Sequence, residues 1–294
     1  NKEMKLSKSF IGLVTVSTIF VLYASGLYTK FQSDSALEIV DFSIAKPASE
    51  KNIPSNPDRV PLYGDLHVHT KYSFDAYIFG VTATPYDAYK YAIGEAIKHP
   101  LGFDMKLKEP LDFYAVTDHG FYMGMIENYA DTSSEMSKNE WTKPMHNLNR
   151  PENVTVESLG ARANLFSSVL TQAIIKPYPY WHPKVWKAWL TNNIQVALQS
   201  FDYDVHKSAW ADVANAAEEF NDPGNFTTFI GYEFTTSTDV EGGNLHRNVI
   251  FDSSKAPIRP WTRIDSLNPE DLWTWMDGLR DQGLDSLAMP HNSN

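Results

Sequence analysis

Residues 63–70 read Tyr-Gly-Asp-Leu-His-Val-His-Thr and contain the end of a short apolar run that begins at Leu62. A run of this length before polar residues predicts a β-strand. Side chains at i and i+2 of a strand project to the same side, about 6.6 Å apart, so His67 and His69 could bind one metal ion. Alone this spacing is equally consistent with a polar strand end, because nine histidines in 294 residues give about 0.3 such pairs by chance.

Apolar runs of similar length recur further along the chain. They cover Leu111–Val116, Phe226–Tyr232, Asn248–Phe251 and Ser286–Met289. Between them, Thr84-Pro85-Tyr86-Asp87 and Asn268-Pro269-Glu270-Asp271 combine an N-cap residue, a proline and acidic residues, which is typical of helix starts. Strands that alternate with helices predict an α/β fold with a mostly parallel sheet, either a barrel or a layered sheet.

Acidic and imidazole side chains follow these predicted strands. They are His67, His69, Asp75, His119, Glu233, His246 and His291. In an α/β barrel the C-terminal ends of the strands share one face, so residues distant in sequence meet there. A mixed set of His, Asp and Glu suits Zn²⁺, Mn²⁺ or Fe²⁺ better than Ca²⁺. The sequence therefore predicts a metal site.

The other histidines lack an apolar run before them, and surface or capping positions are expected. They are His99, His146, His182 and His206. Asp118 and Arg247 adjoin expected ligands and should point away from the metal in extended chain, which favours ion pairing outside the ligand shell. Asn244 and Asn292 either orient a substrate or cap turns, and the turn interpretation is preferred.

Residues 121–224 interrupt the alternation of strands and helices and predict a largely helical insertion, which could cover the site as a lid. Helices are expected around Val185–Phe201 and Lys207–Phe220 from their apolar spacing. The aromatic residues of this region are expected to belong to a helix core rather than to a substrate platform. They are Tyr178, Tyr180, Trp181, Trp186 and Trp189.

The N-terminal region has the pattern of an export signal. Lys2, Lys5 and Lys8 precede an uncharged run over residues 10–29 that contains small residues near its end. Residues 1–29 are expected to be a cleaved signal peptide, with a membrane anchor as the alternative. Either would place the rest of the chain in the periplasm or outside the cell, with the membrane contacted only through such an anchor. The Pro- and Ser-containing residues 30–59 predict a linker.

Composition excludes several classes of function. The formal net charge of −11 leaves no broad basic surface, so nucleic acid is not an expected partner. The chain has no cysteine, which excludes disulfide scaffolds, thiol catalysis and cysteine-bound zinc.

Longer strings of sequence resemble a known family. Residues 63–70, with Tyr-Ser-Phe-Asp at 72–75 and Val-Thr-Asp-His at 116–119, resemble the first two motifs of the polymerase-and-histidinol-phosphatase (PHP) superfamily. Residues 226–233, 242–251 and 290–294 narrow the resemblance to a branch labelled domain of unknown function 3604. The similarity covers about residues 63–294.

The resemblance implies a distorted (β/α)₇ barrel over residues 60–294 whose mouth binds two or three divalent metal ions. It assigns the seven residues named above as ligands, with Glu233 bridging two metals, and Glu233 and His246 are expected to be catalytic. The last motif of the superfamily, Asp-x-His, has no counterpart in the sequence, and the chain begins without Met. A C-terminally truncated fragment with an incomplete barrel is therefore expected.

Three functions fit these features. The first is metal-dependent hydrolysis of a small anionic ester, most plausibly a phosphoester, by metal-activated water. The second uses the same residues on an amide or a sulfate ester, as amidohydrolase barrels do. The third is a non-catalytic exported binding protein with a structural metal.

Overall fold

The structure, a computed structural model, describes residues 16–17, 36–45, 60–172, 181–191, 200–236 and 244–292. Its strands are β1 (Ile39–Asp41), β2 (Gly64–Val68), β3 (Ile97–Lys98), β4 (Asp104–Met105), β5 (Phe113–Val116), β6 (Thr227–Thr228), β7 (Gly231–Phe234), β8 (Arg247–Phe251), β9 (Lys255–Pro257) and β10 (Ser286–Pro290). Every apolar run identified in the sequence overlaps at least one of these strands.

Helices are the other regular elements of the described chain. The α-helices are α2 (Phe74–Ile78), α3 (Pro85–Ala92), α4 (Met125–Ala130), α5 (Leu159–Gln172), α6 (Pro183–Thr191), α7 (Tyr203–Phe220) and α8 (Pro269–Arg280). Short 3₁₀ helices are η1 (Met136–Lys138), η2 (Glu140–Met145), η3 (Pro151–Asn153) and η4 (Val156–Ser158). The fold is mixed α/β, as the sequence predicts.

The strands form a parallel half and an antiparallel half. Strand β5 pairs in parallel with β2 and β6, whereas β8 pairs antiparallel with β7 and β10. A parallel bridge between His119 and Glu233 joins the halves. The expected mostly parallel sheet is therefore wrong for β7, β8 and β10, and no closed barrel forms among the described strands. The described part of the β7–β8 connection holds no helix, and an antiparallel neighbour needs no crossover helix.

Alternation along β7 separates an apolar side of the sheet from a polar side. Tyr232 and Phe251 each make ring contacts with Trp210 of α7 and Trp275 of α8. Glu233, one residue further along β7, projects to the opposite side. The helices therefore cover the apolar side and leave the other side for polar residues.

Gly64 allows β2 to lie against β5. A Cβ atom at this position would lie 2.2 Å from the carbonyl oxygen of Phe113, so any side chain would push the two strands apart. Because β2 carries the first of the expected ligands, this close approach also positions the site.

Both helix starts identified in the sequence are confirmed. Thr84 and Asp87 form a capping box at α3, and the Asn268 side chain accepts a hydrogen bond from the backbone N–H of Glu270 at α8. Helix α7 begins at Tyr203, four residues before the predicted start. The Asp202 carboxylate caps this start, because it accepts hydrogen bonds from the backbone N–H groups of Asp204 and Val205.

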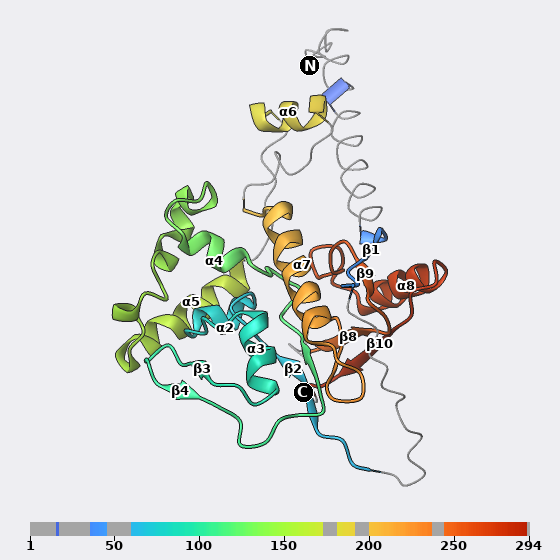
Figure 1. Ribbon diagram of the computed structural model, residues 1–294. Coiled ribbons are helices and arrows are strands. Elements are labelled where there is room, and N and C mark those ends of the chain that lie inside the picture. Colours follow the sequence, from blue (N-terminus) through green and yellow to red (C-terminus); the bar gives the residue numbers. More distant parts are fainter. Residues whose placement is uncertain are drawn as a thin grey trace, which may run out of the picture.

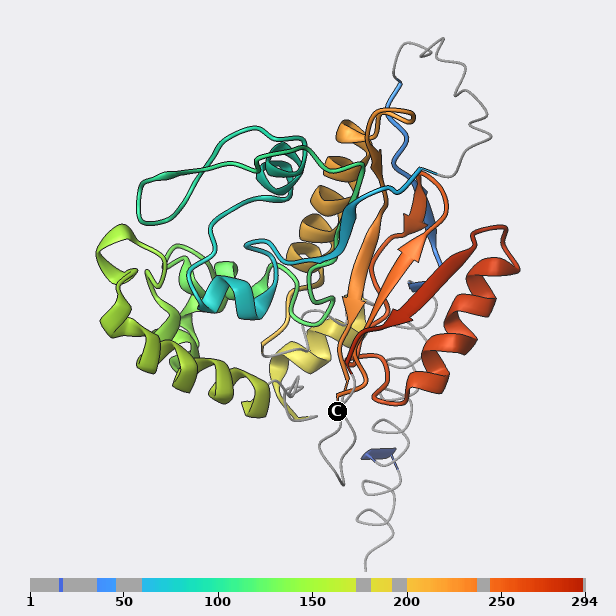
Figure 2. The same ribbon diagram turned by 90° about the horizontal axis from the view of Figure 1, so that it is seen from below.

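The insertion packs mainly as a second body beside the sheet. In Figures 1 and 2, α2, α4 and α5 gather on one side of α7, with the antiparallel strands and α8 on the other. This body has its own apolar core, which includes Phe74, Ile126 and Tyr129. The buried Arg162 guanidinium organises its loops by donating to the carbonyl oxygens of Ile78, Leu148 and Asn153.

Helix α6 does not show the expected aromatic core. Trp181, Trp186 and Trp189 are 64%, 48% and 46% exposed, so the prediction that they are buried in a helix core is wrong. Tyr178 and Tyr180 lie outside the described residues, as does the continuation of the predicted helix from 192 to 199.

Part of the expected linker packs onto the domain. Strand β1 pairs antiparallel with β9, and the indole N–H of Trp275 donates to the carbonyl oxygen of Ala36. The expected export signal falls almost entirely outside the described residues. Over the part of the chain that is described, no helix combines the length and the apolar character needed to cross a membrane.

Candidate metal centre

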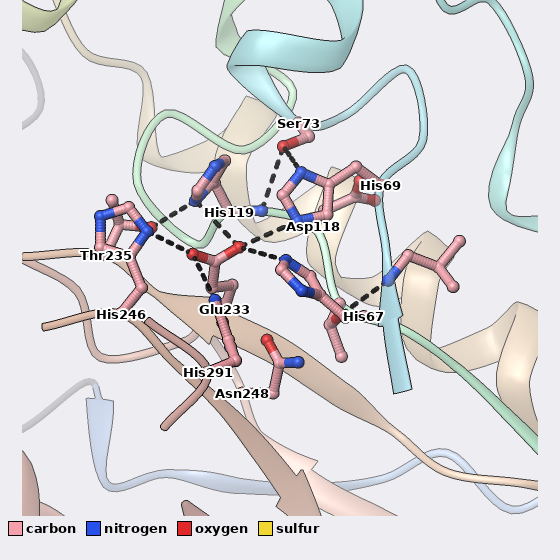
Figure 3. Close-up of polar contacts among 12 residues, drawn as sticks. His67, His69, Ser73, Asp118, His119, Glu233, Thr235, His246, Asn248 and His291 are labelled. Carbon is pink, nitrogen blue, oxygen red and sulfur yellow. Dashed lines mark hydrogen bonds and ion pairs between the residues drawn. The ribbon is translucent and has the colours of Figure 1, made fainter. Parts of the chain in front are cut away.

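The seven side chains predicted as metal ligands meet in one cluster where the two halves of the sheet join. Figure 3 labels all of them except Asp75. Three of them lie within β2, the first turn of α2 and β7. The other four lie in the chain just outside β2, β5, β8 and β10. In sequence order they are His67, His69, Asp75, His119, Glu233, His246 and His291. Residues more than 200 positions apart therefore share one site.

Glu233 lies at the centre of the cluster. Its Oε2 atom is 3.3 Å from His67 Nε2, 2.9 Å from His69 Nε2 and 3.3 Å from His119 Nδ1. Its Oε1 atom is 2.7 Å from His246 Nδ1 and 3.4 Å from His291 Nε2. Five imidazoles thus surround one carboxylate.

Asp75 forms a second acidic position beside the first. Its Oδ1 atom lies 3.2 Å from His69 Nδ1 and its Oδ2 atom 3.5 Å from His119 Nε2. Asp75 Oδ1 also accepts hydrogen bonds from Ser73 Oγ and from the backbone N–H of Ala76, both at 2.6 Å. The first turn of α2 therefore fixes this carboxylate.

The ligand atoms fall into three overlapping groups, each within a sphere that one ion could occupy. The groups are His67 with Glu233 and His291, His69 with Asp75 and His119, and His119 with Glu233 and His246. In each, the donor atoms lie within 4.8 Å of one another. Glu233 belongs to two groups and so does His119.

Unsatisfied buried atoms indicate that these residues fit metal ions. Neither oxygen of Glu233 forms a hydrogen bond with a described residue, and neither does Nε2 of His69, although oppositely charged partners lie close by. Such atoms normally have a partner when buried. Neutral imidazole nitrogens and carboxylate oxygens are also the donors that Zn²⁺, Mn²⁺ and Fe²⁺ accept. The cluster could therefore hold divalent ions.

Charge pairing perturbs several pKa values in the cluster. Burial would lower the pKa of His69, but the hydrogen bond to Asp75 and the nearby negative charges of Asp75 and Glu233 outweigh it and raise that pKa to about 10. Burial would raise the pKa of both carboxyl groups, yet the neighbouring imidazoles hold the pKa of Asp75 and of Glu233 below the ordinary range. Burial lowers the pKa of His119 and of His291.

Asp118 supports the cluster from behind. It is fully buried, faces away from the imidazoles, and accepts hydrogen bonds from the backbone N–H and the hydroxyl of Thr70. Burial raises the pKa of Asp118 to about 6, although the Thr70 hydrogen bonds oppose this shift. Asp118 thereby fixes the chain that follows His69 through hydrogen bonds to Thr70, and the expected ion pair is not found among the described residues.

The expected ion pairing of Arg247 is not found among the described residues. Its guanidinium donates to the carbonyl oxygen of Leu245 and lies over the ring of Trp273. A carbonyl oxygen and an aromatic face thus take the place of the expected carboxylate.

His206 corrects the prediction that the remaining histidines are surface residues. It is 1% exposed, and its Nε2 donates to the carbonyl oxygen of Gly120 at 2.8 Å. Its position on α7, whose apolar face packs on the sheet, buries it. His99 and His182 do occupy turns, where each Nδ1 accepts a backbone hydrogen bond.

Three polar residues of the site were not predicted. Ser73 Oγ contacts His69 Nδ1, Thr235 Oγ1 contacts His119 Nδ1, and Asn248 pairs with Glu233 across the strands. Asn248 follows His246 at the same i, i+2 spacing as His67 and His69, which is the pattern that could have indicated it. No comparable spacing marks Ser73.

The fold and the site define the general class of this protein: an α/β protein with a candidate multinuclear metal centre, in which five histidines and a second carboxylate surround the buried Glu233. The model of a family described as protein of unknown function (DUF3604) matches residues 56–294, and the chain belongs to that family. No curated protein and no solved structure matches the chain.

Proposed function

We propose that the chain is a metal-dependent hydrolase of small phosphate esters with a PHP-type site. The observation that carries the proposal is the sharing of Glu233 and His119 between overlapping ligand groups. Sharing places neighbouring ions close enough to act on one ester, as in two-metal phosphatases. Ions bound by neutral histidines also bring positive charge to an otherwise acidic protein, and an anionic substrate requires it.

The proposal assigns different tasks to buried and accessible ligands. Bound divalent ions lower the pKa of water and polarise the oxygens of an ester. Glu233 and His119 are 1% and 7% exposed at their side chains, and they form the base that fixes the ligand geometry. His67 is 44% exposed and His246 20%, so these imidazoles border the space that a substrate enters.

His246 is the candidate for proton transfer. Its Nδ1 faces Glu233 at 2.7 Å, which fixes the ring and leaves the second ring nitrogen to hand a proton to the departing alcohol. Glu233 would thus be catalytic through its hold on the ligands and on this ring. Zn²⁺, Mn²⁺ and Fe²⁺ are the proposed ions.

The proposal also includes a PHP-like barrel fold and export of the protein from the cytoplasm. The ring centres of His67 and His291 lie only 4.0 Å apart, so the ends of β2 and β10 approach each other across the site. This approach of two sheet edges supports the proposal of a PHP-like barrel. Export from the cytoplasm is proposed from the N-terminal sequence alone.

The test is hydrolysis of 4-nitrophenyl phosphate by the full chain, stripped with a chelator and then reloaded with Mn²⁺ or Zn²⁺. Turnover should depend on the ion and fall to background when His67→Ala and Glu233→Ala are combined. His99→Ala, which removes a histidine outside the cluster, should retain turnover. Absence of metal-stimulated turnover, or full turnover in the double variant, refutes the proposed function.

A further inference from the structure

Asn248 lies among the candidate ligands without belonging to any ligand group. It sits on β8 directly opposite Glu233, with Met289 of β10 as its other neighbour, and it is 4% exposed. Directly opposed residues of antiparallel strands project to the same face. Asn248 therefore occupies the floor of the site.

The carboxamide has a fixed orientation. Its Nδ2 donates to the carbonyl oxygen of Leu66 at 2.7 Å, and Thr117 Oγ1 donates to the same carbonyl at 3.1 Å. Reversing the amide would place two acceptor oxygens against each other, so hydrogen-bond chemistry determines which atom is nitrogen. Asn248 thereby ties the antiparallel half of the sheet to β2 beside His67.

The other end of the same side chain has no partner. Oδ1 is buried and accepts no hydrogen bond from a described residue. Figure 3 shows this oxygen directed toward the side of the site where Glu233 and His291 lie. A buried acceptor without a donor is unfavourable, so this position favours a ligand that supplies one.

We propose that Asn248 Oδ1 accepts a hydrogen bond from a hydroxyl group on the alcohol part of the substrate. An acceptor in this position repels the oxygens of a phosphoryl group and attracts an O–H. This inference rests on the proposed function, and it makes phosphate esters of hydroxylated alcohols the preferred substrates over esters of plain alkyl alcohols.

A matched pair of non-hydrolysable ligands tests this preference without requiring turnover. The Mn²⁺-loaded full chain is titrated calorimetrically with 2-hydroxyethylphosphonate and with ethylphosphonate, which differ by one hydroxyl. A hydrogen bond to a buried acceptor predicts about tenfold tighter binding of the hydroxylated ligand. Asn248→Leu, similar in size, should bring the ratio close to one.

Thr117→Val is the matched control, because it removes the other donor to the Leu66 carbonyl. It should preserve the tenfold ratio even if both ligands bind more weakly. A wild-type ratio near one, or no binding of either phosphonate, overturns the inference whatever the variants do. Fewer Mn²⁺ ions bound by Asn248→Leu also overturn it, since Asn248 would then be a metal ligand. A retained preference without hydrolysis of any ester overturns only the proposed function.

Discussion

Two buried charged groups of this protein are equally hidden from solvent but differ in how their atoms are satisfied. The side chains of Arg259 and Asp265 are each 1% exposed, as is that of Glu233. Arg259 donates from NH1 and NH2 to both oxygens of Asp265, and the backbone N–H of Thr262 donates to the same carboxylate. Both oxygens of Glu233, in contrast, lack a hydrogen bond from any described residue.

Burial alone therefore does not distinguish a structural charge from a functional one. The Arg259–Asp265 pair is a bidentate arrangement in which both carboxylate oxygens accept hydrogen bonds from described residues. Glu233 has five imidazoles close to it, but neither of its oxygens accepts a hydrogen bond from a described residue, which leaves both oxygens able to bind a metal ion. Unsatisfied atoms, rather than hidden charge, identify the site.

The largest loss in the free energy of unfolding should come from breaking the Arg259–Asp265 pair. Asp265→Asn leaves the buried Arg259 cation without its counter-charge, and loss of one partner of a buried pair costs about 3–5 kcal/mol. Urea unfolding of the metal-free protein measures this change. Asp104→Asn breaks the exposed Lys98–Asp104 pair and should cost less than about 1 kcal/mol. Equal effects of the two variants would show that Arg259 is not held by its charge partner.

Mn²⁺ should stabilise the protein by binding to the Glu233 cluster, whereas it should not bind to the Arg259–Asp265 pair. Mn²⁺ at one hundred times its dissociation constant should raise the free energy of unfolding by about 2.7 kcal/mol. Asp265→Asn should show the same gain from its lower starting point, whereas Glu233→Gln should lose most of it, because two ligand groups share that carboxylate. Thermal unfolding with and without Mn²⁺ measures both. An undiminished gain in Glu233→Gln would place the ion elsewhere.

The sequence predicted much of this site because its chemistry follows the strand ends. His67, Glu233 and His291 each lie in or just after an apolar run, and parallel or antiparallel pairing brings those ends together. The strand direction after Glu233 was mispredicted, since every residue of β7 and β8 is buried, and burial on both faces is more typical of parallel strands. Asn248 shares the i, i+2 spacing with His246, but its place opposite Glu233 depends on the cross-strand register, which spacing within one strand does not give.

His206 is a third kind of buried group, because only one of its two ring nitrogens has a hydrogen-bond partner among the described residues. Nε2 donates to Gly120, while Nδ1 is buried without a hydrogen bond from a described residue. Burial lowers the pKa of His206 to about 3 from its ordinary 6.5, although the Gly120 hydrogen bond opposes the shift. The folded protein therefore holds this ring neutral.

The smallest predicted effect is the pH dependence that follows. Below pH 6.5 the unfolded chain takes up a proton at His206 that the folded chain cannot. As the pH decreases, the contribution of His206 to stability therefore falls by about 1.4 kcal/mol per pH unit until the folded pKa is reached. In His206→Gln the carboxamide N–H can still donate to Gly120 but does not titrate. Urea unfolding of the metal-free proteins between pH 7.5 and about 5.5 should show wild type losing about 1.4 kcal/mol more stability than the variant. Parallel curves would mean that the ring becomes protonated in the folded state, and Nδ1 would then require an acceptor that the described residues do not supply.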